Sequence, residues 1–210
     1  MSDSGKKRFL DKAYTVKTDE DTKALYDAWA EVYDEELAEN EYQQPVRCAA
    51  ALAQALSPDD NLIILDVGCG SGLSGLALKN AGYATIDGCD YSTGMLEKAE
   101  ATGAYKRLFE ANLNAPPMDA RDSFYDAATC VGVFSFGHVM ADALDDILRV
   151  VKPGGVLVIG LNDHFYQEGT VTAKLDALEE AGVVTHRKDE HGEHIRVTGL
   201  TGWVIVALRV

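Results

Sequence analysis

Three glycines alternate with other residues directly after an apolar run. The run is residues 62–67, and Gly68, Gly70 and Gly72 follow it in a segment that we call the glycine loop (residues 68–72). Glycine lets the backbone adopt positive φ and come close to a ligand. If a helix begins at this point, its exposed N–H groups attract an anionic group such as a carboxylate or a phosphate. The spacing therefore predicts a binding site for a ligand that carries such a group.

Two classes of cofactor use this kind of loop. The register from Gly70 to Gly75 satisfies the G-x-G-x-x-G fingerprint of nicotinamide dinucleotides, with Asp90 downstream to bind a ribose. That fingerprint should open where the strand ends, and the predicted strand ends earlier, at Val67. The register that fits the strand end begins at Asp66 and alternates through the three glycines. We interpret the dinucleotide match as coincidental and keep an NAD(P)-dependent oxidoreductase as an alternative.

From residue 61 onward, apolar strand patterns alternate with helical patterns. Continuous apolar runs are typical of strands that are buried on both faces of a parallel sheet. The pattern predicts an α/β fold with a doubly wound, mostly parallel, Rossmann-like sheet whose last two strands pair antiparallel. In such sheets ligands bind beyond the carboxyl ends of the central strands, where the glycine loop lies. We expect strands at 62–67, 83–90, 105–112, 124–133, 155–161, 183–187 and 203–210, and helices at 72–81, 92–101, 142–151 and 168–181.

Two further helical patterns precede this core. Apolar residues recur at helical spacing within 25–37 and within 46–56. Residues 1–20 are polar, and we expect them to be flexible. We interpret residues 21–210 as a single domain, which consists of lid helices at 21–57 and a cofactor-binding core at 61–210.

The charge balance restricts the partners. Nineteen Lys and Arg residues against 34 Asp and Glu residues give a formal net charge of −15. An acidic surface repels phosphates, so we expect neither nucleic acid nor a membrane as a partner, and the substrate is expected to be a small molecule. Residues 1–12 do not resemble a signal peptide, no apolar run approaches the ~20 residues of a membrane span, and the four cysteines show no paired spacing. We therefore expect a cytoplasmic protein, and its oligomeric state stays open.

Three motifs lie at the ends of predicted strands. They are residues 66–72 (Asp-Val-Gly-Cys-Gly-Ser-Gly), 89–92 (Cys-Asp-Tyr-Ser) and 151–155 (Val-Lys-Pro-Gly-Gly). Together they resemble the class I S-adenosylmethionine-dependent methyltransferases. The resemblance implies a seven-stranded sheet, S-adenosyl-L-methionine as cofactor and S-adenosyl-L-homocysteine as product. Residues 26–34 and 131–133 are also similar to a methyltransferase-like group of the Williams–Beuren syndrome region, which implies no particular substrate.

The resemblance implies a role for each matching residue. Asp66 and the glycine loop would hold the methionine end of the cofactor, with Asp66 on its ammonium side. Asp90 would accept hydrogen bonds from both ribose hydroxyls, because a carboxylate only accepts. Tyr91 and Met95 would flank the adenine, and Asn112 would bind its amino group. The residues predicted to bind the cofactor are Tyr26, Tyr33, Asp66, Gly68, Cys69, Gly70, Gly72, Asp90, Tyr91, Met95, Asn112, Leu113 and Val131.

Methyl transfer is an in-line displacement, so the protein must align the reactants and in some cases remove a proton. His138 follows the fourth predicted strand in a loop that faces the methyl group in this fold, and it is predicted to take that proton. A surface or helix-capping histidine is the alternative. Tyr26 and Tyr33 share a helix face, and we expect an aromatic lid near the cationic sulfur rather than core packing. The predicted catalytic residues are His138 and Tyr33, and the predicted substrate-binding residues are Tyr42, Phe136, His138 and His164.

Two other interpretations concern the histidines near the carboxyl terminus and the activity itself. His186, His191 and His194 do not have the spacing of a zinc site, so we expect a solvated hairpin away from the site and no bound metal. A regulatory protein that binds S-adenosylmethionine without catalysis would have the same fold. Detectable turnover separates an enzyme from such a protein.

Overall fold

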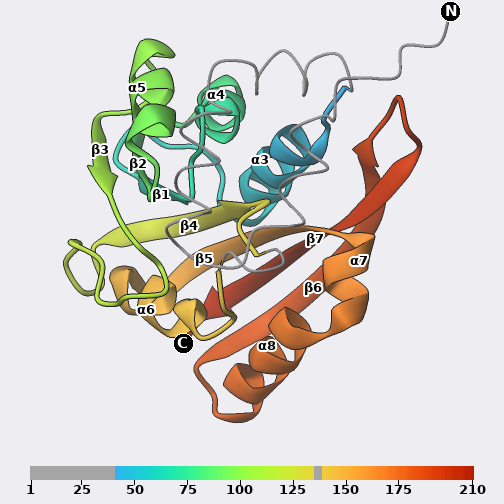
Figure 1. The fold of residues 1–210 in the computed structure, drawn as a ribbon. Coiled ribbons are helices and arrows are strands. Elements are labelled where there is room, and N and C mark those ends of the chain that lie inside the picture. Colours follow the sequence, from blue (N-terminus) through green and yellow to red (C-terminus); the bar gives the residue numbers. More distant parts are fainter. Residues whose placement is uncertain (1–40, 135–138) are drawn as a thin grey trace, which may run out of the picture.

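The computed structural model describes residues 41–134 and 139–210. Seven strands form one mixed sheet in the order β3-β2-β1-β4-β5-β7-β6 (Figure 1). β7 runs antiparallel to both of its neighbours, and the other neighbouring pairs are parallel. The predicted doubly wound sheet with an antiparallel last strand is therefore confirmed. Within the described ranges, no helix combines the length and the apolar character that crossing a membrane requires.

The elements follow the predicted alternation of strands and helices. The strands are β1 (Ile63–Val67), β2 (Thr85–Asp90), β3 (Arg107–Glu110), β4 (Tyr125–Val131), β5 (Val151–Asn162), β6 (Val184–Ile195) and β7 (Leu200–Arg209). The helices in the described residues are α3 (Gln44–Ala55), α4 (Leu73–Asn80), α5 (Thr93–Ala101), α6 (Ala143–Val150), α7 (Asp163–Glu168) and α8 (Thr170–Glu180).

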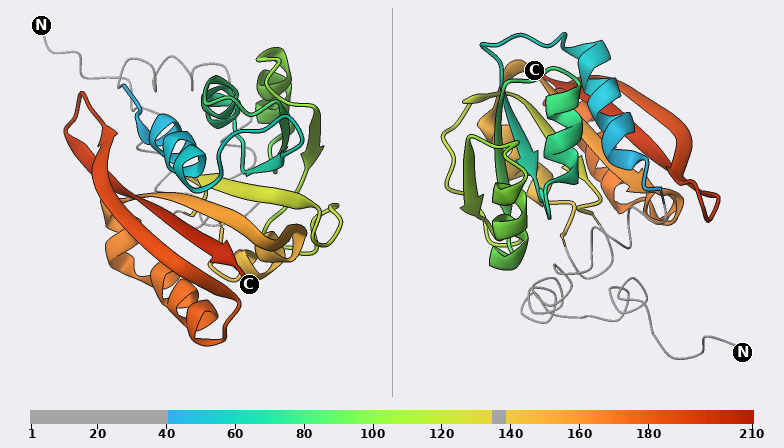
Figure 2. Two further views of the ribbon diagram at one scale, coloured as in Figure 1. Left: turned by 180° about the vertical axis from the view of Figure 1, so that it is seen from behind. Right: turned by 90° about the horizontal axis from the view of Figure 1, so that it is seen from above.

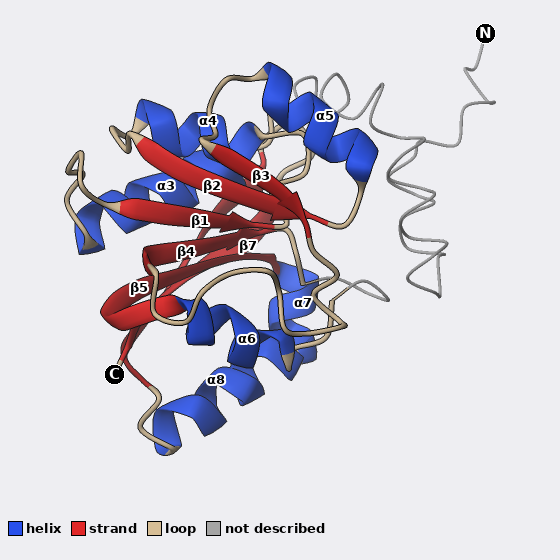
Figure 3. Cartoon of the chain, turned by 90° about the vertical axis from the view of Figure 1, so that its left-hand side faces the viewer, coloured by secondary structure: helices blue, strands red, loops and turns tan. Residues whose placement is uncertain are grey.

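Helices cover both faces of the sheet. α3, α4 and α5 pack on one face, and α6, α7 and α8 pack on the other (Figure 3). Successive side chains of a strand point to opposite faces, so a central strand needs apolar residues on both. Ile64 packs with the first helix layer and Leu65 with the second, and both are fully buried. This double burial explains why β1 is a continuous apolar run in the sequence.

The strand order reverses between β1 and β4. The chain leaves β1 for β2 and β3 on one side, and then returns to β4 and β5 on the other. A ligand site in such sheets lies outside the carboxyl ends of the strands at this switch point. The glycine loop directly follows β1, so the fold positions it at this crevice.

Two features differ from the sequence-based expectation. The helix predicted at 168–181 is confirmed as α8, but the short helix α7 before it was not predicted, and Gly169 with φ +86° separates the two. The last two strands are longer than predicted, and β6 and β7 form an extended hairpin along one edge of the sheet (Figure 2). His186, His191 and His194 therefore lie on the edge strand β6.

Candidate active site

The glycine loop turns the chain from β1 into α4. Gly68, Gly70 and Gly72 have φ of +64°, +53° and +98°, which residues with side chains rarely adopt. Gly68 is also crowded, because a Cβ atom added to it would lie 2.7 Å from Cγ2 of Val133. The loop therefore lies directly against the segment that follows β4.

Asp90, the last residue of β2, fastens the loop to its neighbour strand. Its Oδ2 accepts the N–H of Gly70 at 2.9 Å, and its Oδ1 accepts the N–H of Ser92 at 2.9 Å. The Ser92 hydroxyl in turn caps α5 by accepting the N–H of Met95 at 3.1 Å. Asp90 thus fixes the position of the glycine loop relative to the start of α5.

Asp66 is fully buried beneath the loop. Three hydroxyl groups donate to its carboxylate, from Ser74 at 2.5 Å, Tyr105 at 2.7 Å and Thr129 at 2.9 Å. Burial raises the pKa of the Asp66 carboxyl group to about 6, although these hydrogen bonds act in the opposite direction. The carboxylate joins β1 to α4, to β4 and to the segment before β3. Its direct contact with the ammonium group of a ligand stays a prediction.

Tyr105 is not among the site residues predicted from the sequence, although a glycine in α4 lies against it. Gly75 lies within α4, where its N–H donates to the Tyr105 hydroxyl at 3.1 Å. A Cβ atom added to Gly75 would overlap the Tyr105 ring and hydroxyl. Gly75 therefore makes room for the tyrosine that reaches Asp66. A glycine inside a helical pattern is the signal that could have indicated such a close neighbour.

Most of the other residues predicted to bind the cofactor gather at one edge of the sheet. The carboxyl ends of β3, β2, β1 and β4 are adjacent there. Beyond them, Tyr91 is half-buried, Met95 is buried, and Asn112 accepts the N–H of Asn114 through Oδ1 at 3.0 Å. Their contacts with a cofactor stay predictions. The residues brought together at this edge are Cys69, Tyr91, Met95, Asn112, Leu113 and Val131.

Two residues predicted to bind the substrate lie near the ends of β4 and β5. A Cβ atom added to Gly132, just after β4, would lie 3.1 Å from the Tyr42 hydroxyl. His164 is exposed in the first turn of α7, directly after β5, and its ring lies edge-on to Phe165 with centroids 5.1 Å apart. Both residues therefore lie at the carboxyl edge of the sheet, as the glycine loop does. The predictions for Tyr26, Tyr33, Phe136 and His138 fall on residues outside the described ranges.

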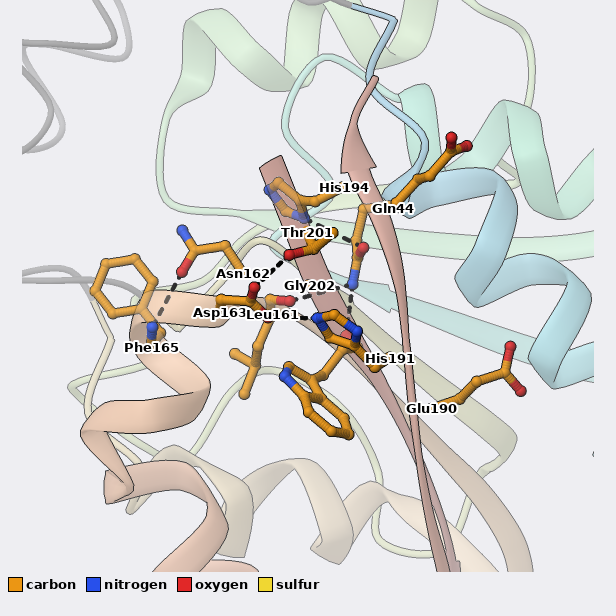
Figure 4. A network of polar contacts seen from close by, with 12 residues as sticks. Gln44, Leu161, Asn162, Asp163, Phe165, Glu190, His191, His194, Thr201 and Gly202 are labelled. Carbon is orange, nitrogen blue, oxygen red and sulfur yellow. Dashed lines mark hydrogen bonds and ion pairs between the residues drawn. The ribbon is translucent and has the colours of Figure 1, made fainter. Parts of the chain in front are cut away.

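The β6–β7 hairpin adds a polar network at the carboxyl end of β5 (Figure 4). Asp163, the first residue after β5, accepts a hydrogen bond from the Thr201 hydroxyl and lies 3.0 Å from Nε2 of His191. His194 is 8% exposed and lies 3.2 Å from Oε1 of Gln44. The expected solvated position is therefore wrong for His194, and both histidines are near the site. The reason is the length of the hairpin, which brings these residues alongside the end of β5.

The chemistry of these residues fits an adenosyl cofactor with an amino-acid end. A carboxylate at the end of β2 accepts hydrogen bonds only, which matches the two hydroxyls of a ribose. The glycine loop lies at the start of α4, where the helix dipole favours an anionic group such as a carboxylate. A Cβ atom added to Gly70 would meet no atom of the described residues within 4 Å, so a ligand can approach the backbone closely at this point. When bound, S-adenosylmethionine supplies an activated methyl group.

Comparison with known proteins gives the class. Residues 65–159 match the family model described as a methyltransferase domain. With the seven-stranded sheet and the motifs at its carboxyl edge, the chain belongs to the class I S-adenosylmethionine-dependent methyltransferases. S-adenosylmethionine is the cosubstrate of that family.

Individual relatives make the relationship more specific. Methyltransferase-like protein 27 from Homo sapiens is 37% identical over 163 residues, which are 76% of this chain and 66% of that protein. Trans-aconitate 2-methyltransferase from Enterobacter sp. (strain 638) is 32% identical over 136 residues, which are 64% of this chain and 52% of that protein. The chain thus spans about two thirds of the first relative and about half of the second.

A solved structure supports the fold. The crystal structure of the cyclase SpnF matches with a TM-score of 0.67 at 17% sequence identity, and the match covers 92% of this chain and 97% of that chain. At this identity the likeness establishes the fold alone, because one fold can host several chemistries.

Proposed function

We propose that the protein transfers a methyl group from S-adenosylmethionine to a small-molecule acceptor by in-line displacement. The observation that carries the proposal is the methyltransferase-domain match of residues 65–159. It is supported by the positive-φ glycine loop and by Asp90, which are joined by a hydrogen bond of 2.9 Å at the carboxyl edge of the sheet. Trans-aconitate 2-methyltransferase acts, by its name, on a small molecule. The net charge of −15 also disfavours nucleic acid as the acceptor.

In this proposal the cofactor lies across the ends of β1, β2 and β4. The glycine loop binds its methionine end and Asp90 binds the ribose hydroxyls. Gly70 and Ser92 donate to the two carboxylate oxygens of Asp90 and so keep the carboxylate oriented. Tyr91 and Met95 flank the adenine. This arrangement would fix the sulfonium in the position that an in-line transfer requires.

The acceptor lies beyond the ends of β4 and β5. Among the described residues, Tyr42 and His164 contribute to this region. His138 removes a proton from the acceptor, and Tyr33 lies near the sulfonium. The 37% identity to methyltransferase-like protein 27 over 76% of this chain supports a place in that methyltransferase-like group.

A radiochemical assay tests the proposal directly. The protein is incubated with S-adenosylmethionine that carries tritium in its methyl group and with a panel of small phenols, amines and carboxylic acids. We expect at least one acceptor to give a labelled product together with an equal amount of S-adenosylhomocysteine. Binding of the cofactor without any transfer would instead support the regulatory protein. Binding of NADPH in its place would support the oxidoreductase.

A further inference from the structure

The side-chain amide of Gln44 has a fixed orientation at the start of α3. Its Nε2 donates to the carbonyl oxygen of Trp203 at 2.6 Å and reaches that of Leu161 at 3.5 Å. Nη1 of Arg47 donates to Oε1 of Gln44 at 3.3 Å. Carbonyl oxygens only accept and a guanidinium only donates, so the reverse orientation of the amide would lose all of these bonds. Oε1 of Gln44 is therefore an acceptor for any other group beside it.

That other group is Nδ1 of His194, at 3.2 Å from Oε1 of Gln44. Because Oε1 can only accept, Nδ1 must carry the proton, and in a neutral ring the lone pair is then on Nε2. Burial of the ring, and next the positive charge of Arg47, lower the pKa of His194 to about 4, while Asp163 acts in the opposite direction. His194 is thus neutral near pH 7. Within the described part of the chain, Nε2 of His194 has no hydrogen-bond partner.

The ring of His194 lies where the acceptor is proposed to bind. The ring packs against Gly202, because a Cβ atom added to Gly202 would lie 3.0 Å from Nδ1 of His194. Gly202 pairs with Asn162 at the end of β5. On another side the Tyr42 ring packs edge-on, with ring centroids 5.1 Å apart. The Tyr42 hydroxyl lies near Gly132, just after β4. In Figure 4 the second ring nitrogen of His194 is turned away from Gln44.

We propose that Nε2 of His194 accepts a hydrogen bond from an O–H or N–H group of the methyl acceptor and thereby selects protic, uncharged acceptors such as phenols, alcohols and aromatic amines. This inference rests on the proposed function. His194 is 8% exposed, and a buried acceptor without a donor is costly. A ligand that supplies a donor removes that cost, whereas a methyl ether or a carboxylate, which only accepts, leaves it in place.

The hydrogen bonds around Arg47 show that the network positions His194 rather than binding an anion. Its guanidinium donates to the carbonyl oxygens of Glu190, Glu193 and Gly202 at 2.9–3.1 Å, besides the bond to Gln44. These bonds hold the α3 side chains against the β6–β7 hairpin. The orientation of His194 is therefore set before any ligand binds, which is the condition for selectivity.

Kinetics of matched variants test the inference. In His194→Asn the amide N–H can replace Nδ1–H toward Gln44, but the acceptor at Nε2 is lost. In His194→Gln the longer amide can place an oxygen near the position of Nε2. The control is His186→Asn, the same change on the same strand at an exposed residue whose φ of +53° asparagine tolerates.

We expect kcat/KM for the acceptor to fall about tenfold in His194→Asn. Part of this loss should be recovered in His194→Gln, and His186→Asn should match the wild type. Binding of S-adenosylhomocysteine, measured by calorimetry, should be equal in all four proteins. If His194→Asn transfers methyl groups like the control, or loses S-adenosylhomocysteine binding as well, the inference is overturned while the proposed function stands.

A spectroscopic test requires no turnover. Nitrogen-15 spectra of the histidine side chains, recorded with saturating S-adenosylhomocysteine, should show His194 with a proton on Nδ1 and none on Nε2. Phenol should shift the Nε2 resonance, and anisole, which lacks the donor, should not. A proton on Nε2, or the same response to both compounds, would contradict the inference. Absence of S-adenosylhomocysteine binding in the wild type would instead contradict the proposed function.

Discussion

Replacement of Asp66 by asparagine removes a buried ionisable group, so it should change how the stability of the protein depends on pH. Burial raises the pKa of this carboxyl group from 3.8 to about 6 in the folded protein. The folded state therefore holds the proton more tightly than the unfolded state does. The stabilisation by the proton is complete below pH 3.8 and is lost as the pH rises through about 6.

The magnitude follows from the linkage relation. Each pKa unit corresponds to about 1.36 kcal/mol, so the protonated and ionised forms differ by about 3 kcal/mol in stability. When the pH is lowered from 7.5 to 5, this linkage should raise the free energy of unfolding of the wild type, relative to that of Asp66→Asn, by about 1.4 kcal/mol. The other carboxyl groups titrate in both proteins, so the difference between the two isolates Asp66.

Urea unfolding followed by circular dichroism measures this difference. Wild type and Asp66→Asn are compared at pH 5 and pH 7.5, with Asp60→Asn as a control that removes one exposed carboxylate. The control measures what the loss of one surface charge contributes at each pH, and the change of the Asp66→Asn difference with pH should exceed it. The reasoning would be refuted if the Asp66→Asn difference is independent of pH, or if the wild type gains relative stability at the higher pH.

Two further substitutions test the site. Asp90→Ala should weaken S-adenosylhomocysteine binding at least tenfold, because the ribose hydroxyls and the Gly70 N–H lose an acceptor worth about 1.5–3 kcal/mol; unchanged affinity in calorimetry would contradict this placement. Gly75→Ala should destabilise the protein by about 1–3 kcal/mol in urea unfolding, since the added methyl group displaces Tyr105. The cost should largely disappear when Gly75→Ala is made in a Tyr105→Ala protein, and a fully additive double variant would exclude the clash as its cause.

The central sheet could be predicted because each inner strand is apolar on both faces. β1 (Ile63–Val67) begins one residue later than the sequence indicates and ends at the predicted residue. The glycine loop could also be predicted, because its positive φ values are a local property that only glycine adopts easily. These features depend on neighbouring residues in the chain, which is why a single sequence reveals them.

The edge of the sheet and the contacts of the site could not be read in this way. Residues 188–193 of β6 are mostly polar, and they form a strand because β7 pairs with them. The partners of Asp66 come from α4, from β4 and from the segment before β3, and no spacing in the sequence brings Ser74, Tyr105 and Thr129 together. The contact between Gln44 and His194 likewise joins residues 150 positions apart. Such tertiary contacts leave no periodic pattern.

Thermal unfolding with separate additions of S-adenosylmethionine, S-adenosylhomocysteine, NADH and NADPH tests the central claim most directly. A ligand at about 100 times its Kd stabilises the folded state by about 2.7 kcal/mol, which corresponds to an increase in Tm of several degrees for a domain of about this size. We predict such an increase with the two adenosyl-sulfur compounds and none with the nicotinamides. An increase with NADH or NADPH alone would contradict the assignment of the cofactor and restore the register that starts at Gly70.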